Sequence, residues 1–356
     1  MSIFSAPDFD DHEAVHVIHD GPSGLKAIIA LHSTHLGPGF GGCRFWTYEN
    51  EQAAMDDALR LSRGMSYKNA LAGLAYGGGK AVILGGKDLR KTPELFEAFG
   101  RAVEQLNGSY VTAEDVGVSV EDMLSVAKTT KHVSGIPRTK GAFQGGDPSP
   151  RTARGVFEGL RAAVKFGLDS DLEGLTVAVQ GLGSVGYNLA SLLHAAGAHL
   201  IVADLSDDAV QKVCDTYGAE RAAPDEILHA KADVLAPCAL GGVLNEKTIP
   251  ALNVKVVAGA ANNQLATEQD GARLMEHGIV YAPDYVINAG GIISVAAEYD
   301  GTANAQEVDA RVADIGPRTY AILEEASHLN RPADVVADER ARVLIGRAEP
   351  NAIAAE

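Results

Sequence analysis

Cysteine is scarce in this sequence, with three among 356 residues. Cys43, Cys214 and Cys238 stand far apart and form no CxxC pair. Because these thiols are odd in number and widely spaced, they argue against a disulfide framework and against a cysteine-ligated zinc site. We expect reduced cysteines, as in cytosolic proteins, and no bound metal.

Positive charge is also in short supply. Lysine and arginine number 30 against 47 aspartates and glutamates, which gives a formal net charge of −17. A surface this acidic repels the phosphates of nucleic acids and of anionic membranes. No run of about 18 apolar residues is present, and the acidic start, MSIFSAPDFDDHE, lacks the apolar segment of a signal peptide. We therefore expect a cytoplasmic protein with no nucleic-acid and no membrane partner.

What the sequence does contain is ordinary for a globular protein, at 46% hydrophobic and 22% charged residues. Its length suggests two domains, each large enough to form its own core. Strand-like and helix-like segments alternate over much of the chain. This alternation predicts an α/β fold.

A glycine turn organises the second half of the chain. Residues 175–180 form a short, apolar, β-branched run that is typical of a buried parallel strand. Gly181, Gly183 and Gly186 follow as GxGxxG, and a helical pattern begins after them. Such glycines allow a tight turn, close approach of a pyrophosphate and close packing of helix on strand. A glycine turn alone also occurs for structural reasons, but the flanking strand and helix favour a dinucleotide site.

An acidic residue follows at the distance that this site requires. Asp204 ends the next strand-like run, about 20 residues after the glycines, where a carboxylate accepts hydrogen bonds from a ribose 2′-hydroxyl. The next four residues, LSDD, offer no cation for a 2′-phosphate and add like charge. The sequence therefore predicts NAD rather than NADP as the cofactor.

The first half predicts a second α/β unit. Residues 13–19 and 25–34 are rich in β-formers and flank a turn, which predicts a hairpin. Residues 36–46, LGPGFGGCRFW, indicate a glycine-rich loop that turns sharply or brings its backbone against a ligand. Helices are predicted at three places with suitable first residues: from Glu51, after Thr92 and after Ser119.

These patterns divide the chain. The glycine- and proline-rich residues 137–150 are the best candidate for a domain connection. We predict an N-terminal α/β substrate, catalytic and oligomerisation domain over residues 1–136 and a Rossmann-type, doubly wound NAD-binding domain over residues 150–330, with a cleft between them. A helical segment, residues 331–356, is expected to return to the first domain. Further strands are predicted at residues 232–235, 254–258, 279–282 and 286–287.

Two lysines and one carboxylate are candidates for catalysis. Lys68 and Lys80 lie in apolar or glycine-rich surroundings, which favours a partly desolvated amine suited to acid–base work. Asp115 follows a strand-like segment, where an active-site carboxylate is often presented. The spacing alone leaves a second interpretation open, in which the lysines form structural salt bridges and Asp115 caps a turn.

Eight motifs in this order resemble those of the glutamate, leucine, phenylalanine and valine dehydrogenases, and leucine dehydrogenase most closely. They are LGPGFGGCR, GMSYKNALAGLAYGGGKAVI, TAEDVG, GDPSPRTARGV, VQGLGSVG, LAPCALGG, VVAGAANNQL and YAPDYVINAGG. The resemblance spans nearly the whole chain. It implies NAD-dependent, reversible oxidative deamination of an L-amino acid to its 2-oxo acid and ammonia, an oxidoreductase reaction of branched-chain amino-acid catabolism.

The resemblance also implies roles for single residues. Lys80 matches the catalytic lysine, Asp115 the carboxylate that exchanges protons with the amino group, and Lys68 the lysine that holds the substrate carboxylate. The other implied substrate-binding residues are Gly41, Phe40, Ala113, Asn262, Asn288, Ile292 and Val295. The implied cofactor-binding residues are Gln180, Gly181, Leu182, Gly183, Ser184, Val185, Gly186, Asp204, Thr152, Cys238, Ala239 and Asn262.

Substrate choice is less determined. The implied pocket is apolar, so a second carboxylate would lack a partner and glutamate is disfavoured. Phe40 replaces the leucine that is usual in leucine dehydrogenases, and its ring either shortens the pocket or rotates aside. L-Leucine is the expected substrate, with valine or phenylalanine as alternatives. A non-catalytic NAD-binding sensor is the competing class, and the family implies a homo-oligomer.

Overall fold

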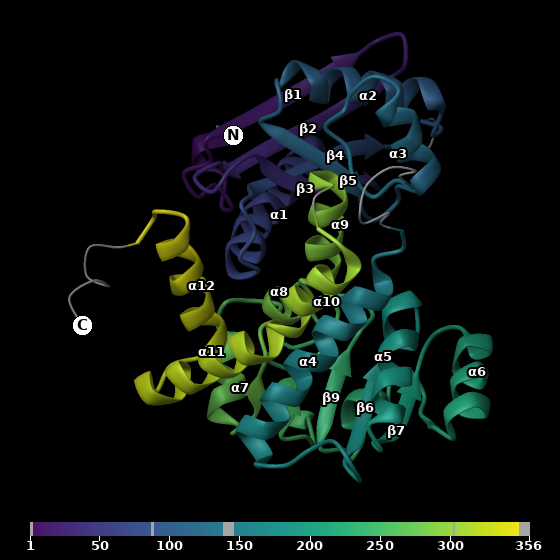
Figure 1. Ribbon diagram of the computed structural model, residues 1–356, viewed down its shortest axis with the longest axis vertical. Coiled ribbons are helices and arrows are strands. Elements are labelled where there is room, and N and C mark those ends of the chain that lie inside the picture. The colour runs from purple at the N-terminus through teal and green to yellow at the C-terminus, as the bar shows by residue number, and fades with distance from the viewer. Residues whose placement is uncertain (1–2, 87–88, 138–145, 302, 349–356) are drawn as a thin grey trace. The chain divides into compact units, whose positions relative to one another are not determined.

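The computed structural model describes residues 3–86, 89–137, 146–301 and 303–348 (Figure 1). Two compact units are present. Unit 1 comprises Met1–Gly146, Val295–Asn304 and Arg340–Glu356, and unit 2 comprises Asp147–Ser294 and Ala305–Glu339. This division differs from the expected ranges, because residues 295–304 belong to unit 1 and unit 2 extends to residue 339. Most of the expected connection, residues 138–145, lies outside the described residues.

Unit 1 contains a five-stranded mixed sheet in the order β1-β2-β4-β3-β5. Its strands are β1 (Ala14–Asp20), β2 (Leu25–Ser33), β3 (Gly39–Thr47), β4 (Gly77–Gly85) and β5 (Tyr110–Glu114). The predicted hairpin is confirmed, since β1 and β2 pair antiparallel from Asp20 and Leu25 outward. Strands β4 and β5 both run parallel to β3, which lies between them.

The interpretation of residues 36–46 as a loop was wrong, because most of this stretch forms β3. Glycine is required here by close packing inside the sheet rather than by a turn. A Cβ added at Gly41 would lie 1.9 Å from the carbonyl oxygen of Gly79. One added at Gly42 would lie 2.6 Å from that of Glu114. The glycines thus hid a central strand from a propensity-based reading.

Helices cover both faces of this sheet. Helix α1 (Glu51–Leu71) packs Ala54, Ala58 and Leu59 against Val82 of β4. Helices α2 (Pro93–Gln105) and α3 (Val120–Ala127) share the opposite core with Ala81 and other sheet residues. The three predicted helix starts are confirmed, including the reciprocal capping pair at the start of α3.

Unit 2 contains a six-stranded sheet in the order β11-β10-β9-β6-β7-β8, and every pairing in it is parallel. Its strands are β6 (Thr176–Gln180), β7 (His199–Ala203), β8 (Glu220–Arg221), β9 (Val234–Pro237), β10 (Val256–Val257) and β11 (Val280–Tyr281). The chain order reverses between β6 and β9. This is the doubly wound topology that was predicted, and its switch point is where such sheets bind ligands.

The helices of unit 2 follow the predicted alternation, with one exception. Figure 1 shows α5 beside β6 and β7, and α4 packs against α5 and β10. The helices are α4 (Ser149–Leu168), α5 (Ser184–Ala195), α6 (Asp207–Tyr217), α7 (Asp270–Glu276), α8 (Asp284–Ile287), α10 (Ala305–Ala313) and α11 (Ile315–Leu329). The strand predicted at residues 286–287 was wrong, because these residues end α8, a single turn that begins after Pro283.

Two helices contain residues of both units. Helix α9 (Gly290–Asp300) begins in unit 2 and continues in unit 1 from Val295, and α12 (Ala333–Leu344) continues in unit 1 from Arg340. The part of the chain that the structure describes also contains three short 3-10 turns: η1 (Ile3–Ser5), η2 (Ile227–His229) and η3 (Ile249–Ala251). Within the described ranges, no helix is both long and apolar enough to cross a bilayer.

Candidate active site

An ion pair between a buried lysine and a partly buried aspartate lies at the sheet of unit 1. Lys80 lies in β4 and is 5% exposed, and Asp115 is the first residue after β5. The Lys80 Nζ atom lies 3.1 Å from Asp115 Oδ2. Because Val82 faces α1, side-chain alternation places Lys80 on the same face of β4. The structure therefore joins two of the three predicted catalytic candidates.

A glycine of β3 leaves room for this pair. Strand β3 separates β4 from β5, so Asp115 reaches toward Lys80 across it. A Cβ at Gly42 would lie 2.9 Å from the Cβ of Asp115. Any larger residue at this position would displace the carboxylate. The glycine-rich sequence before Cys43 is thus tied to the placement of a charged group.

Asp115 has a second cationic partner. The Arg44 guanidinium donates from Nε to Asp115 Oδ2 at 2.9 Å. Burial alone would raise the pKa of Asp115, but Lys80 and then Arg44 hold it below its ordinary value. These two cations thereby keep Asp115 ionised as a carboxylate. Sequence reasoning missed Arg44, although the quoted motif LGPGFGGCR ends on it.

The remaining candidates of unit 1 lie on neighbouring elements. Lys68 is half-buried near the end of α1, the helix that covers the Lys80 face of the sheet. Gly41 is buried in β3, Ala113 in β5 and Val295 in α9. Sequence reasoning had assigned all four, with Lys80 and Asp115, to one substrate site.

Phe40 is enclosed by aromatic side chains of unit 1. Its ring is fully buried and packs edge-to-face on Tyr76 and Tyr299, with centroid distances of 4.9 and 5.9 Å. Each tyrosine is itself held. The Tyr76 hydroxyl donates to Asp300, and the Tyr299 hydroxyl lies 3.0 Å from Nδ1 of His132. These contacts oppose rotation of the Phe40 ring out of its place.

In unit 2 the glycine turn links the end of β6 to α5. Gly181 has a φ of +95°, which disfavours a side chain, and a Cβ at Gly186 would lie 2.0 Å from the Gly181 carbonyl oxygen. Gly183 is exposed, with no described heavy atom within 4 Å of an added Cβ. Its open side and the helix start after it leave backbone N–H groups for a pyrophosphate. These residues fit a bound dinucleotide.

The predicted acid lies beside this turn. Asp204 follows β7, and its carboxylate accepts hydrogen bonds from the backbone N–H of Leu182 at 2.6 Å and of Ser206 at 2.8 Å. Cys238 follows β9, where its N–H donates to the Gln180 carbonyl at 2.7 Å. A Cβ at Gly181 would lie 2.8 Å from Ala239. Seven predicted cofactor contacts, Gln180–Gly186 of the turn, therefore adjoin Asp204, Cys238 and Ala239 at the switch point.

Cys238 does not have the properties of a reactive thiolate. Part of the residue is exposed, but burial of its thiol raises the pKa to about 12. A neutral thiol beside the glycine turn is consistent with a packing role. Burial likewise raises the pKa of Cys43 well above its ordinary value.

Two predicted asparagines are joined directly. Asn288 donates from Nδ2 to Asn262 Oδ1 at 2.9 Å and to the Ala260 carbonyl at 3.2 Å. Its Oδ1 is buried without a hydrogen-bond partner among the described residues. A buried acceptor of this kind is costly unless a donor reaches it, so it suits a site that a ligand completes.

Thr152 and Ile292 are two further predicted site residues of unit 2, and they lie on helices α4 and α9. Thr152 is on α4 and donates from its hydroxyl to the Pro148 carbonyl at 3.0 Å. A Cβ at Gly291 would lie 2.5 Å from that hydroxyl oxygen, so Thr152 packs against the start of α9, next to Ile292. The glycine at position 291 permits this contact.

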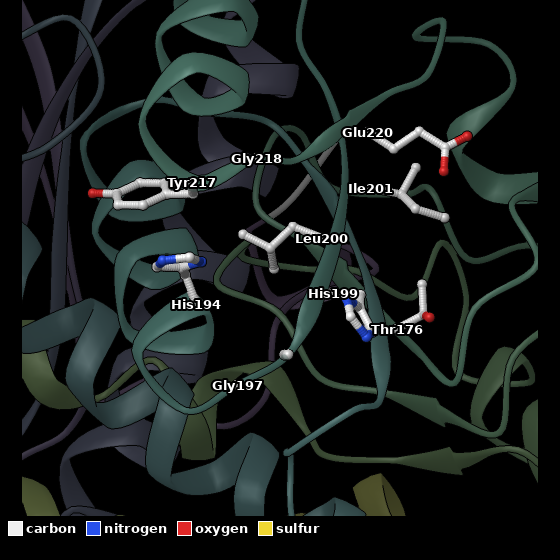
Figure 2. Close-up of a pocket in the computed structure, with 10 residues that line it drawn as sticks. Thr176, His194, Gly197, His199, Leu200, Ile201, Tyr217, Gly218 and Glu220 are labelled. Carbon is white, nitrogen blue, oxygen red and sulfur yellow. The ribbon is translucent and has the colours of Figure 1, made fainter.

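A cavity lies in unit 2 at the amino ends of the strands, at the edge of the sheet opposite the glycine turn. It has a volume of about 480 Å³ and is lined by the starts of β6 and β7 and the ends of α5 and α6 (Figure 2). The rings of His194 and Tyr217 lie in it with centroids 5.2 Å apart and planes tilted by 36°. The cavity adjoins the amino ends of the strands, whereas cofactors of doubly wound sheets bind at the carboxyl ends.

One motif of the sequence was overlooked. Residues 12–16 read HEAVH, which matches the HExxH zinc signature. In the structure Ala14 already belongs to β1, so the two histidines do not lie on successive turns of a helix. Nε2 of His12 instead lies 3.0 Å from both the Leu59 carbonyl and the Ser62 hydroxyl, and burial lowers the pKa of His12 to about 4. Among the described residues, no group of three or more His, Cys, Asp or Glu side chains is arranged to hold a metal ion.

Comparison with known families agrees with both units. The model of the Glu/Leu/Phe/Val dehydrogenase dimerisation domain matches residues 12–132, and that of Glutamate/Leucine/Phenylalanine/Valine dehydrogenase matches residues 202–338. The chain belongs to this family. Its members are NAD(P)-dependent amino-acid dehydrogenases, so the predicted family, fold and enzyme class are confirmed.

Individual relatives cover nearly the whole chain. Leucine dehydrogenase of Bacillus subtilis (strain 168) is 50% identical over 98% of this chain and 95% of its own length. Valine dehydrogenase of Streptomyces albus is 47% identical over 94% of this chain and 93% of its own. The crystal structure of L-tryptophan dehydrogenase from Nostoc punctiforme superimposes with a TM-score of 0.82 at 42% identity, covering 94% of this chain and 96% of that one. The predicted likeness to leucine dehydrogenase is confirmed.

Proposed function

We propose that this protein is an NAD-dependent dehydrogenase of branched-chain L-amino acids, with L-leucine as the expected substrate. It converts the amino acid reversibly to the 2-oxo acid and ammonia. The observation that carries the proposal is the largely buried Lys80–Asp115 pair, in a chain 50% identical to a leucine dehydrogenase. The pair supplies what the proton transfers of this reaction need.

NAD⁺, when bound, accepts the hydride from the α-carbon of the amino acid. The chain's own residues then handle protons and water. In its neutral form, Lys80 takes a proton from the water that adds to the resulting imine carbon. Asp115 exchanges protons with the departing nitrogen. Because the Lys80 Nζ atom lies 3.1 Å from Asp115 Oδ2, the two groups can pass a proton between them without solvent.

Lys68 is assigned to the substrate carboxylate. A cation on α1 gives the bound amino acid a fixed end, so the α-carbon is presented in one orientation. The residues assigned to the side-chain pocket, Phe40, Ala113, Ile292 and Val295, are apolar. An apolar pocket accepts an aliphatic side chain and leaves a glutamate carboxylate unpaired.

The fixed position of Phe40 favours a second substrate, L-valine. Because Tyr76 and Tyr299 enclose the ring, it occupies space that a smaller leucine side chain would leave open. A shorter pocket accepts valine more readily relative to leucine. Apolar pockets discriminate one methylene by about 1–3 kcal/mol, so both substrates are expected to react.

The preference for NAD over NADP rests on charge. Asp204 beside the glycine turn favours a free ribose 2′-hydroxyl, and Asp207 and Asp208 follow it. Arg221 of β8 is paired with Asp207. An arginine that is already neutralised contributes less to binding a 2′-phosphate.

A homo-oligomer in the cytoplasm remains our proposal for assembly and location. The family model over residues 12–132 is described as a dimerisation domain. Strand β1 is an edge strand, and its Val17 is exposed. Light scattering coupled to size exclusion would give the subunit number directly.

The test is NADH formation at alkaline pH with L-leucine, L-valine, L-isoleucine, L-phenylalanine and L-glutamate. We expect turnover with the branched aliphatic substrates, weak turnover with phenylalanine and none with glutamate. NAD binding without turnover on any substrate would favour the non-catalytic sensor instead. Substituting NADP in the same assay tests the cofactor preference.

A further inference from the structure

Arg44 occupies a position that the proposed reaction does not yet explain. It lies in β3, and its side chain is 18% exposed. Its Nε donates to Asp115 Oδ2 at 2.9 Å, the same oxygen atom that Lys80 Nζ approaches at 3.1 Å. One carboxylate oxygen therefore has two cationic partners from two neighbouring strands.

Arg44 is itself held from a helix. Its Nη1 donates to Asp57 Oδ2 on α1 at 2.9 Å. The same oxygen of Asp57 accepts a hydrogen bond from the Tyr48 hydroxyl at 2.7 Å, and Arg60 donates to the other oxygen at 2.9 Å. Because a guanidinium is planar and directional, two carboxylates on different sides fix both its position and its orientation.

This arrangement has an electrostatic consequence. A fixed cation beside a proton-exchanging pair favours the state of that pair with fewer protons. The Asp115 carboxylate also interacts with two cations, Arg44 and Lys80, rather than with Lys80 alone. Burial strengthens both effects, because water screens these charges poorly.

We propose that Arg44 is a positioning residue that holds Asp115 toward Lys80 and sets the pH range in which the Lys80–Asp115 pair exchanges protons. The inference rests on the proposed function, since it assigns Arg44 to the proton transfers of that reaction. Asp57 on α1 forms an ion pair with Arg44 of β3. Arg44 in turn pairs with Asp115, which pairs with Lys80.

Other titratable groups lie around this cluster. Tyr48 after β3 and Asp57 and Arg60 of α1 are on its own face of the sheet, and Cys43 of β3 and Tyr110 of β5 are in the core on the opposite face. Burial raises the pKa of Cys43, Tyr48 and Tyr110 above their ordinary values, so they stay neutral near pH 8. The charge that differs among the variants below is therefore that of residue 44 or 60.

The test compares pH profiles of kcat/KM for the wild type, Arg44→Gln and Arg60→Gln with the best substrate of the panel. We expect the acid limb of the Arg44→Gln profile to move to higher pH by about one unit, because loss of a proton from the Lys80–Asp115 pair becomes less favourable without a fixed cation beside it. Arg60→Gln is the matched control. It removes the same charge from the same Asp57, but Arg60 is half exposed and pairs with Asp57 rather than with Asp115. Its profile is expected to be unchanged.

Folding is not expected to obscure the result. In Arg44→Gln, Asp115 keeps Lys80 and Asp57 keeps Arg60 and Tyr48, so neither carboxylate loses every partner. Arg44→Lys gives a second test: it retains the charge but not the fork, so we expect a lower kcat with an unshifted profile. Equal profiles and equal kcat for Arg44→Gln and the wild type would overturn the inference, as would equal shifts for Arg44→Gln and Arg60→Gln.

A readout without catalysis separates this inference from the proposed function. The pH dependence of Lys80 acylation by a small amine-selective reagent, followed by peptide mass spectrometry, reports proton loss from the pair. We expect its midpoint to move upward in Arg44→Gln and not in Arg60→Gln. If the wild type turns over no amino acid yet the midpoint moves, the proposed function fails and the role of Arg44 on the pair stands. If turnover is present and neither the midpoint nor the profile moves, the role of Arg44 fails alone.

Discussion

The two units form their sites by different means. In unit 2 the turn after β6 is made of backbone: three glycines, a helix start and one acid, all within a short stretch of chain. In unit 1 the Lys80–Asp115 pair joins a side chain of β4 to one that directly follows β5, across β3, and the two residues are more than thirty apart in sequence. Substitutions should therefore act differently in the two places. A substitution in the glycine turn should act by displacing the backbone, whereas a substitution in the Lys80–Asp115 pair should act by changing a charge.

The largest effect on cofactor binding is expected at Gly186, the most tightly packed glycine of the GxGxxG turn. A Cβ at Gly186 would lie 2.0 Å from the Gly181 carbonyl oxygen, so Gly186→Ala must push α5 away from β6. We expect NAD affinity to fall by about a hundredfold, since misplacement by about an ångström has effects of this size. Titration by protein fluorescence measures it.

Gly183→Ala sharpens this result. An added Cβ there meets no described atom within 4 Å, so the melting temperature is expected to stay near that of the wild type. NAD affinity should still fall, because the methyl group occupies the side that faces the pyrophosphate. Unchanged NAD binding in both variants would show that the turn does not bind the cofactor.

A tenfold effect is expected from the aromatic cluster of unit 1. Phe40→Leu removes the ring that Tyr76 and Tyr299 enclose and opens space beside it. We expect the ratio of kcat/KM for L-leucine over L-valine to rise by about tenfold, within the range for one methylene in an apolar pocket. Phe9→Leu, which loses an edge-to-face contact with Phe4 instead, serves as the control. An unchanged ratio in Phe40→Leu would separate Phe40 from the substrate pocket.

The smallest effect concerns stability and comes from opposite pKa shifts in the two units. Burial raises the pKa of Asp334, at the start of α12, to about 6, and its Oδ1 has no hydrogen-bond partner among the described residues. The pKa of Asp115 is instead lowered by Lys80 and Arg44 against the effect of burial. Since the folded-state pKa of Asp334 is raised, its contribution is most favourable below its ordinary pKa and is lost as pH rises through about 6.

Asp334→Asn should remove this dependence. We expect the variant to melt a few degrees above the wild type at pH 8 and with little difference at pH 4, by differential scanning calorimetry. Asp338→Asn on the same helix is a useful comparison, because Asp338 already accepts a hydrogen bond from Tyr285. A gain for Asp334→Asn that is equal at both pH values would contradict the raised pKa.

The sequence predicted best what depends on neighbours in the chain. The hairpin of β1 and β2, the caps at Thr92 and Ser119, and the GxGxxG turn are all local patterns, and the structure contains each of them. Glycine-rich β3 was misread, because its glycines are required by the neighbouring strands, which no local window includes. The single-turn helix α8 was misread as a strand because two β-branched residues follow Pro283 and Tyr285.

The candidate site followed the same division. Resemblance to a family drew attention to Lys80 and Asp115, but their contact arises from the order β4-β3-β5, which the spacing does not reveal. Arg44 was missed because its importance depends on Asp57 and Asp115, which are distant in sequence. Conversely, HEAVH matched a zinc motif in letters, while strand geometry at Ala14 keeps its histidines apart.

The most direct measurement of the central claim is NADH formation from L-leucine or L-valine by the wild type and by Lys80→Ala, with NAD binding measured in parallel. The account predicts a loss of kcat of about 10²–10⁴-fold in Lys80→Ala, the range for a group that moves a proton, with NAD affinity retained. Lys128→Ala, at an exposed pair with Glu97, should retain activity. Turnover by Lys80→Ala at the rate of the wild type would contradict the assignment of proton transfer to the Lys80–Asp115 pair.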